Sequence, residues 1–283
     1  MSGKLLGVTF KSKKVQELAE FYKNVLGMSI EQQSNGTLCH FPGKPESASL
    51  RLVQDESEIK EEEEDKSDDR KNVYWKIGLS LADVDLARAK ILEKGQEVSA
   101  PSQFLDIGYL CHTSDCEGRA IELLQHTFAA NFIKPVEEPG KVLGQDALIG
   151  QITLRCSDIS QSLKFYRDIL GMKLLSIQEV KPYNFTLYFL AFTDESPPGD
   201  DDLHSVDIRE WLWQRPYTTL EIQHIPKASL QRMERKGVQC IDIKVPDKNV
   251  EDKLRNAGFD IQEKGKDFCV VNDPDFATIL LHY

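Results

Sequence analysis

The chain has 283 residues, 40% of them hydrophobic and 29% charged, which is the composition of an ordinary water-soluble globular protein. Its net charge of −11 and the lack of a basic stripe argue against nucleic acid as a partner. Apolar stretches stay well short of the roughly 20 residues of a membrane helix, and neither a secretion signal nor disulfide spacing is present, so we expect a cytoplasmic protein without a membrane partner.

The first predicted elements are a short β-rich segment at residues 6–10 and a helix that stops near Gly27. The nonamer Glu-Phe-Tyr-Lys-Asn-Val-Leu-Gly-Met at residues 20–28 returns 144 positions later as Lys-Phe-Tyr-Arg-Asp-Ile-Leu-Gly-Met. This second copy also follows a β-rich segment, at residues 151–155. A repeat of this length indicates that the chain is built from two related halves.

Each half also contains a weaker repeat. Residues 76–84 and 240–248 both read as a strand that runs into a helix start, and the two helices stop alike at Gly95 and Gly258. Both segments then close with a turn and a final strand, at residues 115–125 and 273–283. The chain therefore reads as four βαβββ units, which predicts an α+β fold of antiparallel-rich sheets with helices on their outer faces.

Two pseudo-domains are predicted, residues 1–139 and residues 140–283. The connecting segment, residues 128–148, carries Pro135, Pro139 and Gly140 and shows little apolar periodicity, so we place the boundary near Gly140. Residues 55–70 hold ten acids against three bases. Because like charges so close repel one another, this acidic loop should be a solvated connection between the first two units. A metal-collecting or partner-binding tract is the alternative.

The clearest candidates for metal-binding residues lie in the third unit. Gln151 opens one strand and Glu221 lies in another, at residues 218–224. Alternation along both strands directs these polar side chains to the face opposite their apolar neighbours. A carboxylate and an amide oxygen on one sheet face are hard ligands suited to a divalent metal such as Zn or Ni. The alternative is that both are ordinary rim residues.

Residues 151–172, followed by the β-rich residues 185–192, resemble glyoxalase I (lactoylglutathione lyase) of the vicinal oxygen chelate superfamily. The close resemblance covers roughly residues 149–224, and the other units match only at superfamily level. It implies four units that form two pseudo-domains of the glyoxalase/bleomycin-resistance type. It also implies a divalent metal and glutathione as co-substrate.

The resemblance further implies four metal ligands, a Gln and a Glu from one unit and a His and a Glu from another. Gln151 and Glu221 fall on the first pair. The His position is Lys76 in the second unit and Cys240 in the fourth. The last Glu, which the family uses as ligand and general base, falls on Glu122 in the second unit.

In the fourth unit that last position is Leu280, and in the first unit the Gln and Glu positions are Gly7 and Arg51. If sites form within each half, neither collects a working set of ligands, although Gln151, Glu221 and Cys240 could hold a metal. If the halves interlock, as the resemblance to double-length glyoxalases implies, unit two meets unit three. One site then collects nearly all the ligands, which is the more economical arrangement.

Lys76 is the main departure from the family pattern. An ammonium cannot bind a metal unless it loses its proton, and two nearby carboxylates favour the charged form. The first hypothesis is therefore a glyoxalase I-like lyase, with a single site between units two and three. The second is a non-catalytic small-molecule-binding protein in which Lys76 pairs with Glu122 and Glu221 and replaces the metal. An oxygenase, a third reading, lacks its histidines.

For the lyase, the resemblance implies isomerisation of the hemithioacetal of glutathione and methylglyoxal to a 2-hydroxyacyl thioester, with Glu122 as base and Glu221 as ligand and second base. Arg155 falls on the arginine that binds the glutathione carboxylate, with a surface ion pair to Asp158 or a nearby acid as the alternative. The predicted pocket-lining residues, for which plain core is the alternative, are Phe185, Leu187 and Phe189.

The family's glutathione-binding asparagine is Ile225 here, which weakens the assignment of a glutathione substrate. The aromatic residues 211–217 could shape a pocket entrance or pack between the halves. A four-unit chain already contains the pairing that single-length relatives obtain by dimerising. We therefore expect a monomer.

Overall fold

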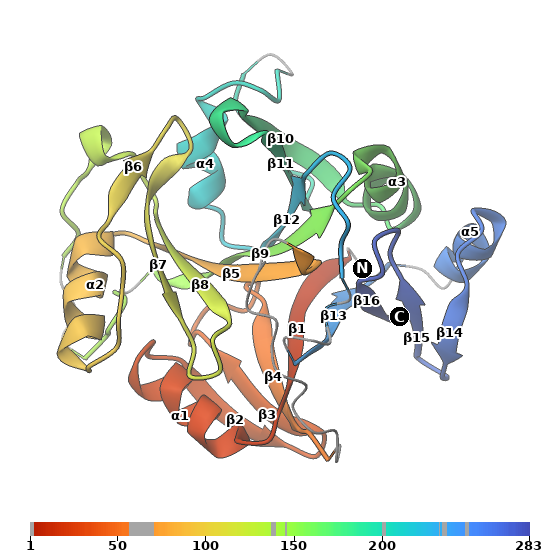
Figure 1. The fold of residues 1–283 in the computed structure, drawn as a ribbon, viewed down its shortest axis with the longest axis horizontal. Helices are drawn as coiled ribbons and strands as arrows, with labels where there is room; N and C mark the ends of the chain where they lie inside the picture. Colours follow the sequence, from red (N-terminus) through yellow and green to blue (C-terminus); the bar gives the residue numbers. More distant parts are fainter. Residues whose placement is uncertain are drawn as a thin grey trace.

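The protein is described by a computed structural model at residues 3–56, 71–136, 140–144, 146–199, 202–231, 233, 237–246 and 249–283. Within these residues the strands form two eight-stranded sheets (Figure 1). The first sheet has the order β14-β15-β16-β13-β1-β4-β3-β2. The second has the order β10-β11-β12-β9-β5-β8-β7-β6. The predicted α+β fold is confirmed.

The first sheet consists of β1 (Lys4–Ser12), β2 (Ser29–Gln33), β3 (Gly36–His40), β4 (Ser49–Gln54), β13 (Val238–Lys244), β14 (Ile261–Lys264), β15 (Phe268–Asn272) and β16 (Thr278–His282). The second consists of β5 (Tyr74–Leu81), β6 (Ser102–Phe104), β7 (Gly108–Ser114), β8 (Ala120–Gln125), β9 (Leu148–Cys156), β10 (Lys173–Val180), β11 (Phe185–Ala191) and β12 (Thr219–His224). The α-helices are α1 (Val15–Asn24), α2 (Val84–Glu93), α3 (Ile159–Leu163), α4 (Ile208–Trp213) and α5 (Val250–Asn256). A π-helical turn, η3 (Lys164–Ile169), continues α3, and the two short 3₁₀ turns are η2 (Ala129–Asn131) and η4 (Lys181–Tyr183).

Each sheet takes strands from both halves of the sequence. The first joins unit one to unit four through antiparallel β1 and β13, and the second joins unit two to unit three through antiparallel β5 and β9. Within each unit the first and last strands pair in parallel, as β5 does with β8. The halves therefore interlock. The division into residues 1–139 and 140–283 remains a prediction about the sequence, since each sheet spans it.

The repeated nonamer forms the same structure in both halves. In α1 the side chains of Leu18, Ala19 and Tyr22 are buried against the outer face of the first sheet. The chain then turns at Gly27 with φ 73° and, at the matching position, at Gly171 with φ 85°. Glycine adopts this left-handed backbone without the steric cost that a side chain brings. Both predicted helix stops are confirmed.

Helix α4 was not among the predicted helices of the four units, and it does not lie on an outer face. This helix lies in the hollow of the second sheet (Figure 1), where Leu212 and Trp213 pack against Phe189 of β11 and Leu124 of β8. The connection between β11 and β12 is long enough to place a helix there. In the first sheet the corresponding connection, between β3 and β4, contains no helix.

The two sheets are therefore covered differently. Strands β8, β9 and β12 are buried on both faces along almost their whole length. Strands β3, β15 and β16 instead alternate strictly between buried and half-exposed residues. Such alternation is typical of a sheet with one packed face and one face open to water. The second sheet is therefore covered on both faces along β8, β9 and β12, whereas the first sheet leaves one face accessible to water along β3, β15 and β16.

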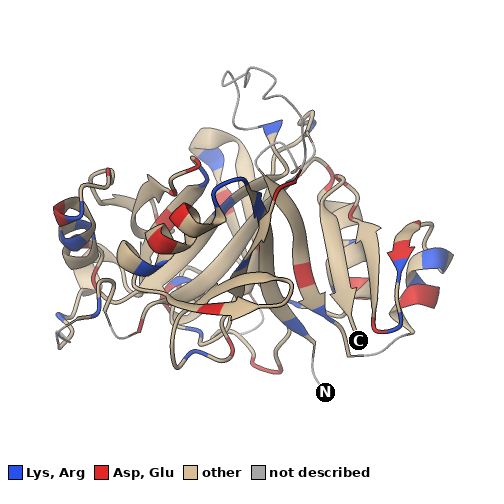
Figure 2. Cartoon of the chain, turned by 90° about the horizontal axis from the view of Figure 1, so that it is seen from below, with Lys and Arg blue, Asp and Glu red and all other residues tan. Residues whose placement is uncertain are grey.

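Residues 57–70 of the predicted acidic loop lie outside the described residues. In Figure 2 the Lys and Arg segments are interspersed with Asp and Glu segments along the chain. No helix in the described part of the chain is long and apolar enough to span a membrane.

Two tyrosine–aspartate hydrogen bonds tie the sheets together. Tyr22 of α1 donates to Asp115, in the turn before β8, at 3.0 Å. Tyr166 of η3 donates to Asp273, in the turn before β16, at 2.8 Å. Asp115 also pairs with the buried guanidinium of Arg119 at 3.0 Å. The position that matches Arg119 is an alanine in the fourth unit, so burial raises the pKa of Asp273 to about 7.

Replacing Asp273 by Asn should stabilise the protein above pH 7. A carboxyl with a pKa near 7 when folded and about 3.9 when unfolded makes stability fall as the pH rises between those values. Asn removes the charge and can still accept the backbone N–H groups of Asp275 and Ala277. We expect a gain of about 1–3 kcal/mol at pH 8 that vanishes below about pH 4 in urea unfolding.

The matched control is Asp115→Asn, which removes the charge that compensates Arg119. This variant should lose about 3 kcal/mol of stability near neutral pH, because it leaves a buried guanidinium short of a partner. Equal losses for both variants at every pH would contradict this account of Asp273.

Candidate functional site

The register of the second sheet brings the four predicted metal-ligand positions onto one face. Strand β5 pairs with β9 so that Lys76 lies opposite Thr153 and Gly78 opposite Gln151. Glu221 of β12 lies on the other side of Thr153, and Glu122 of β8 lies on the other side of Gly78. Residues directly opposite one another share a sheet face. The polar side chains of three neighbouring strands therefore converge around Lys76.

Gly78 leaves the space that the Gln151 side chain fills. A Cβ atom at position 78 would lie 2.3 Å from Cγ of Gln151, which is far inside van der Waals contact. Gln151 therefore reaches Glu122, and its Nε2 donates to Oε1 of that carboxylate at 2.7 Å.

Lys76 binds both carboxylates of the cluster. Its Nζ lies 2.8 Å from Oε1 of Glu122 and 3.2 Å from Oε2 of Glu221. Thr153 donates a further hydrogen bond to Oε2 of Glu221, at 2.9 Å. The exposed fractions are 2% for Lys76, 5% for Glu122 and 1% for Glu221, so the group is almost fully withdrawn from water.

Burial and charge act in opposite directions on these three groups. Burial disfavours the ammonium, but Glu122 and Glu221 outweigh it and raise the pKa of Lys76 above its ordinary value. Burial also disfavours the Glu122 carboxylate, but Lys76 and His112 lower its pKa to about 2. For Glu221 burial prevails, and the pKa is raised. A single ammonium neutralises only one of the two buried carboxylates, so Glu221 takes up a proton more easily than Glu122.

These residues do not fit a divalent metal as they stand. The Lys76 ammonium lies between the carboxylates that would coordinate the ion, and a charged ammonium has no lone pair to offer. Gln151 directs its amide N–H, not its oxygen, at Glu122. In the described part of the chain no group of three or more His, Cys, Asp or Glu side chains is arranged to hold a metal.

His112 belongs to this cluster, although its sequence context gave no signal for it. It lies on β7 directly opposite Glu122, and its Nε2 is 3.1 Å from Oε2 of that residue. Its side chain is 44% exposed, so it connects the buried carboxylate to solvent. The contact depends on the register of the β7–β8 hairpin, which the turn at residues 115–119 sets. Predicting it from the sequence would have required that register.

The predicted pocket-lining residues pack against α4. Leu187 and Phe189 are buried in the same cluster as Trp213, and the rings of Phe189 and Trp213 lie 5.2 Å apart in an edge-to-face arrangement. Nε1 of Trp213 donates to the backbone oxygen of Ile107 at 3.0 Å. Phe185 is partly buried at the edge of the cluster. The aromatic segment at residues 211–217 thus helps fill the space above the Lys76 cluster, where a ligand of this face would lie.

Arg155 is buried, so it does not form the surface ion pair that was the alternative. Its Nε donates to Oε1 of Gln223 at 3.0 Å, and its Nη1 donates to the backbone oxygen of Asn72 at 3.0 Å. The guanidinium also lies 4.8 Å from the ring of Trp75. Asp158 instead caps α3 by accepting backbone N–H bonds. The role of Arg155 in binding a ligand carboxylate remains a prediction.

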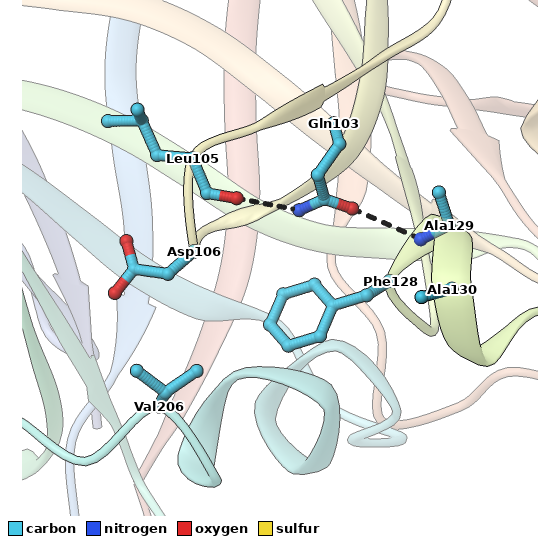
Figure 3. Close-up of a pocket in the computed structure, with 7 residues that line it drawn as sticks. All are labelled: Gln103, Leu105, Asp106, Phe128, Ala129, Ala130 and Val206. Atoms are coloured by element: carbon cyan, nitrogen blue, oxygen red, sulfur yellow. Dashed lines mark hydrogen bonds between the residues drawn. The ribbon is translucent and has the colours of Figure 1, made fainter.

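A cavity of about 320 Å³ lies beside the first residues of α4 (Figure 3). In Figure 3 the amide of Gln103 bonds the backbone of Leu105 and Ala129 across its upper wall, and the Phe128 ring projects toward it. None of the predicted site residues lines it. A second cavity, of about 550 Å³, lies between residues 97–99 and β7 and has His112 among its lining residues.

Comparisons with known proteins agree with this fold. The sequence model of the Glyoxalase/Bleomycin resistance protein/Dioxygenase superfamily matches residues 148–210. Glyoxalase I from Zea mays superposes with a TM-score of 0.69 at 17% identity, covering 99% of this chain and 92% of the maize chain. A putative dioxygenase from Bacillus subtilis superposes with a TM-score of 0.58 at 13% identity, over 99% of this chain and 85% of its own.

Sequence relatives match over shorter stretches. A lactoylglutathione lyase from Haemophilus influenzae is 42% identical over 50 residues, which are 18% of this chain and 37% of the relative. One from Oryza sativa is 33% identical over 86 residues, which are 30% of this chain and 24% of the relative. The chain thus spans well under half the length of either relative. The repeat, the two interlocked sheets and these similarities show that the chain has the fold of glyoxalase I, and the superfamily model matches it over residues 148–210.

Proposed function

We propose that this protein is a non-catalytic member of the superfamily, in which Lys76 replaces the metal ion. The observation that carries the proposal is the position of the Lys76 ammonium, within 2.8 Å of Glu122 and 3.2 Å of Glu221. The ammonium is held there by two charge-assisted hydrogen bonds, and its raised pKa keeps it protonated at neutral pH.

The chemistry of the ammonium supports this proposal. A divalent metal stabilises an enediolate by direct coordination to its oxygens. Lys76 carries one charge, and its Nζ already donates to two carboxylates. Because the two carboxylates already pair with the ammonium, it offers little positive charge to stabilise the oxygens of a substrate. Glu122 is likewise a poor base for a carbon acid, because Lys76 and His112 hold its pKa at about 2.

A glyoxalase I-like lyase is the second candidate, and one specific observation favours it. Gln151, Glu122 and Glu221 converge from two units, as the resemblance to the family implies. With a Zn or Ni ion bound, such a site would supply the Lewis acid for isomerising a glutathione hemithioacetal of methylglyoxal. This candidate requires Lys76 to lose its proton and turn away. The four units within one chain support a monomer under either candidate.

Metal binding separates the two candidates. We expect protein purified without chelator, then incubated with Zn²⁺ or Ni²⁺ and desalted, to retain far less than one metal per chain. Lys76→His should raise the content towards one per chain, because imidazole supplies the missing ligand beside Gln151, Glu122 and Glu221. The measurement is metal content by mass spectrometry.

The matched control is Lys76→Met, which removes the ammonium without adding an imidazole and should bind less metal than Lys76→His. Near-stoichiometric metal in the unaltered protein, lost on Glu221→Gln, would overturn the proposal. That result would support the lyase and justify a hemithioacetal assay.

The Lys76→Met variant also tests the buried ion cluster itself. It leaves two carboxylates buried without a cation, so we expect a loss of about 3–5 kcal/mol at pH 8 in urea unfolding. Without Lys76 both folded-state pKa values lie above their unfolded values. The lost stability should therefore return as the pH falls and the carboxyls take up protons.

The triple variant Lys76→Met, Glu122→Gln, Glu221→Gln removes all three charges and should recover most of that loss at pH 8. A Lys76→Met loss that is independent of pH would instead indicate poor packing of the methionine.

A further inference from the structure

Exposed apolar side chains gather at one corner of the second sheet. Leu105, in the turn between β6 and β7, is 47% exposed, and Val206, just before α4, is 41% exposed. Both line the cavity of about 320 Å³. Tyr183 of η4, 60% exposed, packs its ring 5.7 Å from that of Phe104, the neighbour of Leu105. Single exposed apolar residues are ordinary, but a group of them around a cavity indicates a binding surface.

Leu105 holds an unfavourable backbone conformation at the edge of this cavity. Its φ is 49°, in the left-handed region that residues with a side chain seldom adopt. The amide of Gln103 fixes it (Figure 3): Nε2 donates to the backbone oxygen of Leu105 at 3.0 Å, and Oε1 accepts from the backbone N–H of Ala129 at 3.1 Å. Both polar ends of Gln103 are thus used within the wall, and such fixed, strained residues cluster at binding sites.

The cavity has apolar groups on two sides. The Phe128 ring projects toward it from one side, and Val206 and Asp106 lie on the opposite side (Figure 3). The backbone N–H of Phe128 donates to Oε1 of Glu210 in α4 at 2.7 Å, so the wall that carries the ring is anchored to the helix. The cavity volume is at the small end of the range for ligand pockets, about 300–1,000 Å³. A molecule with a single ring therefore has a suitable size.

Asp106 is the one charged residue among the described residues that line this cavity. Its side chain is 50% exposed, and its Oδ2 lies 3.9 Å from Nη2 of Arg209, beyond hydrogen-bond distance. The Arg209 guanidinium is buried and donates instead to Oγ of Ser176 and to the backbone oxygen of Ser205. Within the described chain no side chain or backbone group hydrogen-bonds to Oδ1 of Asp106. This carboxylate is therefore available to a positively charged ligand.

We propose that this cavity binds a small amine that carries one apolar ring. The ring packs between Phe128 and Val206, and the ammonium pairs with Asp106 through a charge-assisted hydrogen bond. An anion of the same shape is repelled by the same carboxylate. No residue of the Lys76 cluster lines the cavity. The site therefore goes beyond the function proposed above, and either proposal can fail while the other stands.

The test is an NMR titration of the methyl-labelled full-length protein at pH 7 and constant ionic strength. The probes are benzylamine, benzyl alcohol and phenylacetate, which present similar rings with a positive, neutral or negative group. We expect benzylamine to give saturable shifts of the Leu105 and Val206 methyl signals. It should bind about fivefold more tightly than benzyl alcohol, as a partly exposed ion pair allows, and phenylacetate should bind most weakly. Equal affinity for the three probes, shifts confined to the cavity beside His112, or no saturable shift would overturn the proposal.

Two variants separate the charge from the apolar wall. Asp106→Asn should reduce benzylamine binding to the level of benzyl alcohol, and Phe128→Ala should weaken both probes about tenfold. The matched controls are Asp260→Asn and Phe276→Ala, which alter exposed residues next to β14 and β16, on the far side of the molecule from β6 (Figure 1). Both controls should leave the affinity within about twofold, and a control as damaging as its partner variant would contradict the site. The titration of the unaltered protein does not depend on how stable the variants are.

Discussion

The antiparallel pairing of β5 with β9 is the contact on which the site depends. It joins strands from opposite halves of the sequence, and its register fixes Lys76 opposite Thr153 and Gly78 opposite Gln151. A slip of one residue would turn every polar side chain of the pair to the other face. The buried ion cluster and the sheet register therefore specify each other. Lys76 satisfies Glu122 and Glu221 only in this alignment, and a misaligned strand would bury those charges without a partner.

The same βαβββ unit leads to two different environments in one chain. In the second sheet the connection between β11 and β12 folds into α4 and closes the face that carries Lys76. In the first sheet the connection between β3 and β4 contains no helix, and the matching face, with Arg51 and Asp242, stays open. The buried ion pairs also differ between the two sheets. A buried cation binds two acids in one sheet, and a buried acid binds a histidine in the other.

Much of this organisation could be predicted from the sequence, because it rests on local patterns. The repeated nonamer predicted the units, and the helix stops at Gly27 and Gly171 follow from backbone conformations that glycine favours. The proximity of Gln151, Glu122 and Glu221 was expected only from the resemblance to double-length glyoxalases, in which unit two meets unit three. Two features were missed. His112 reaches Glu122 only through the register of the β7–β8 hairpin. Helix α4 packs on the face of the second sheet where its apolar side chains contact Phe189 and Leu124.

The sequence by itself determined the number of units, their α+β character and the residue types at the positions that match the metal ligands of glyoxalase I by resemblance, including a lysine in place of histidine. These properties depend on neighbours along the chain. The tertiary structure decided which units pair, that Lys76 lies between two carboxylates, and which face is sealed. Such outcomes depend on strand register across halves and on competition between burial and charge pairing. Both involve residues far apart in the sequence, such as Lys76 and Glu221, which are 145 positions apart and whose contact no local pattern encodes.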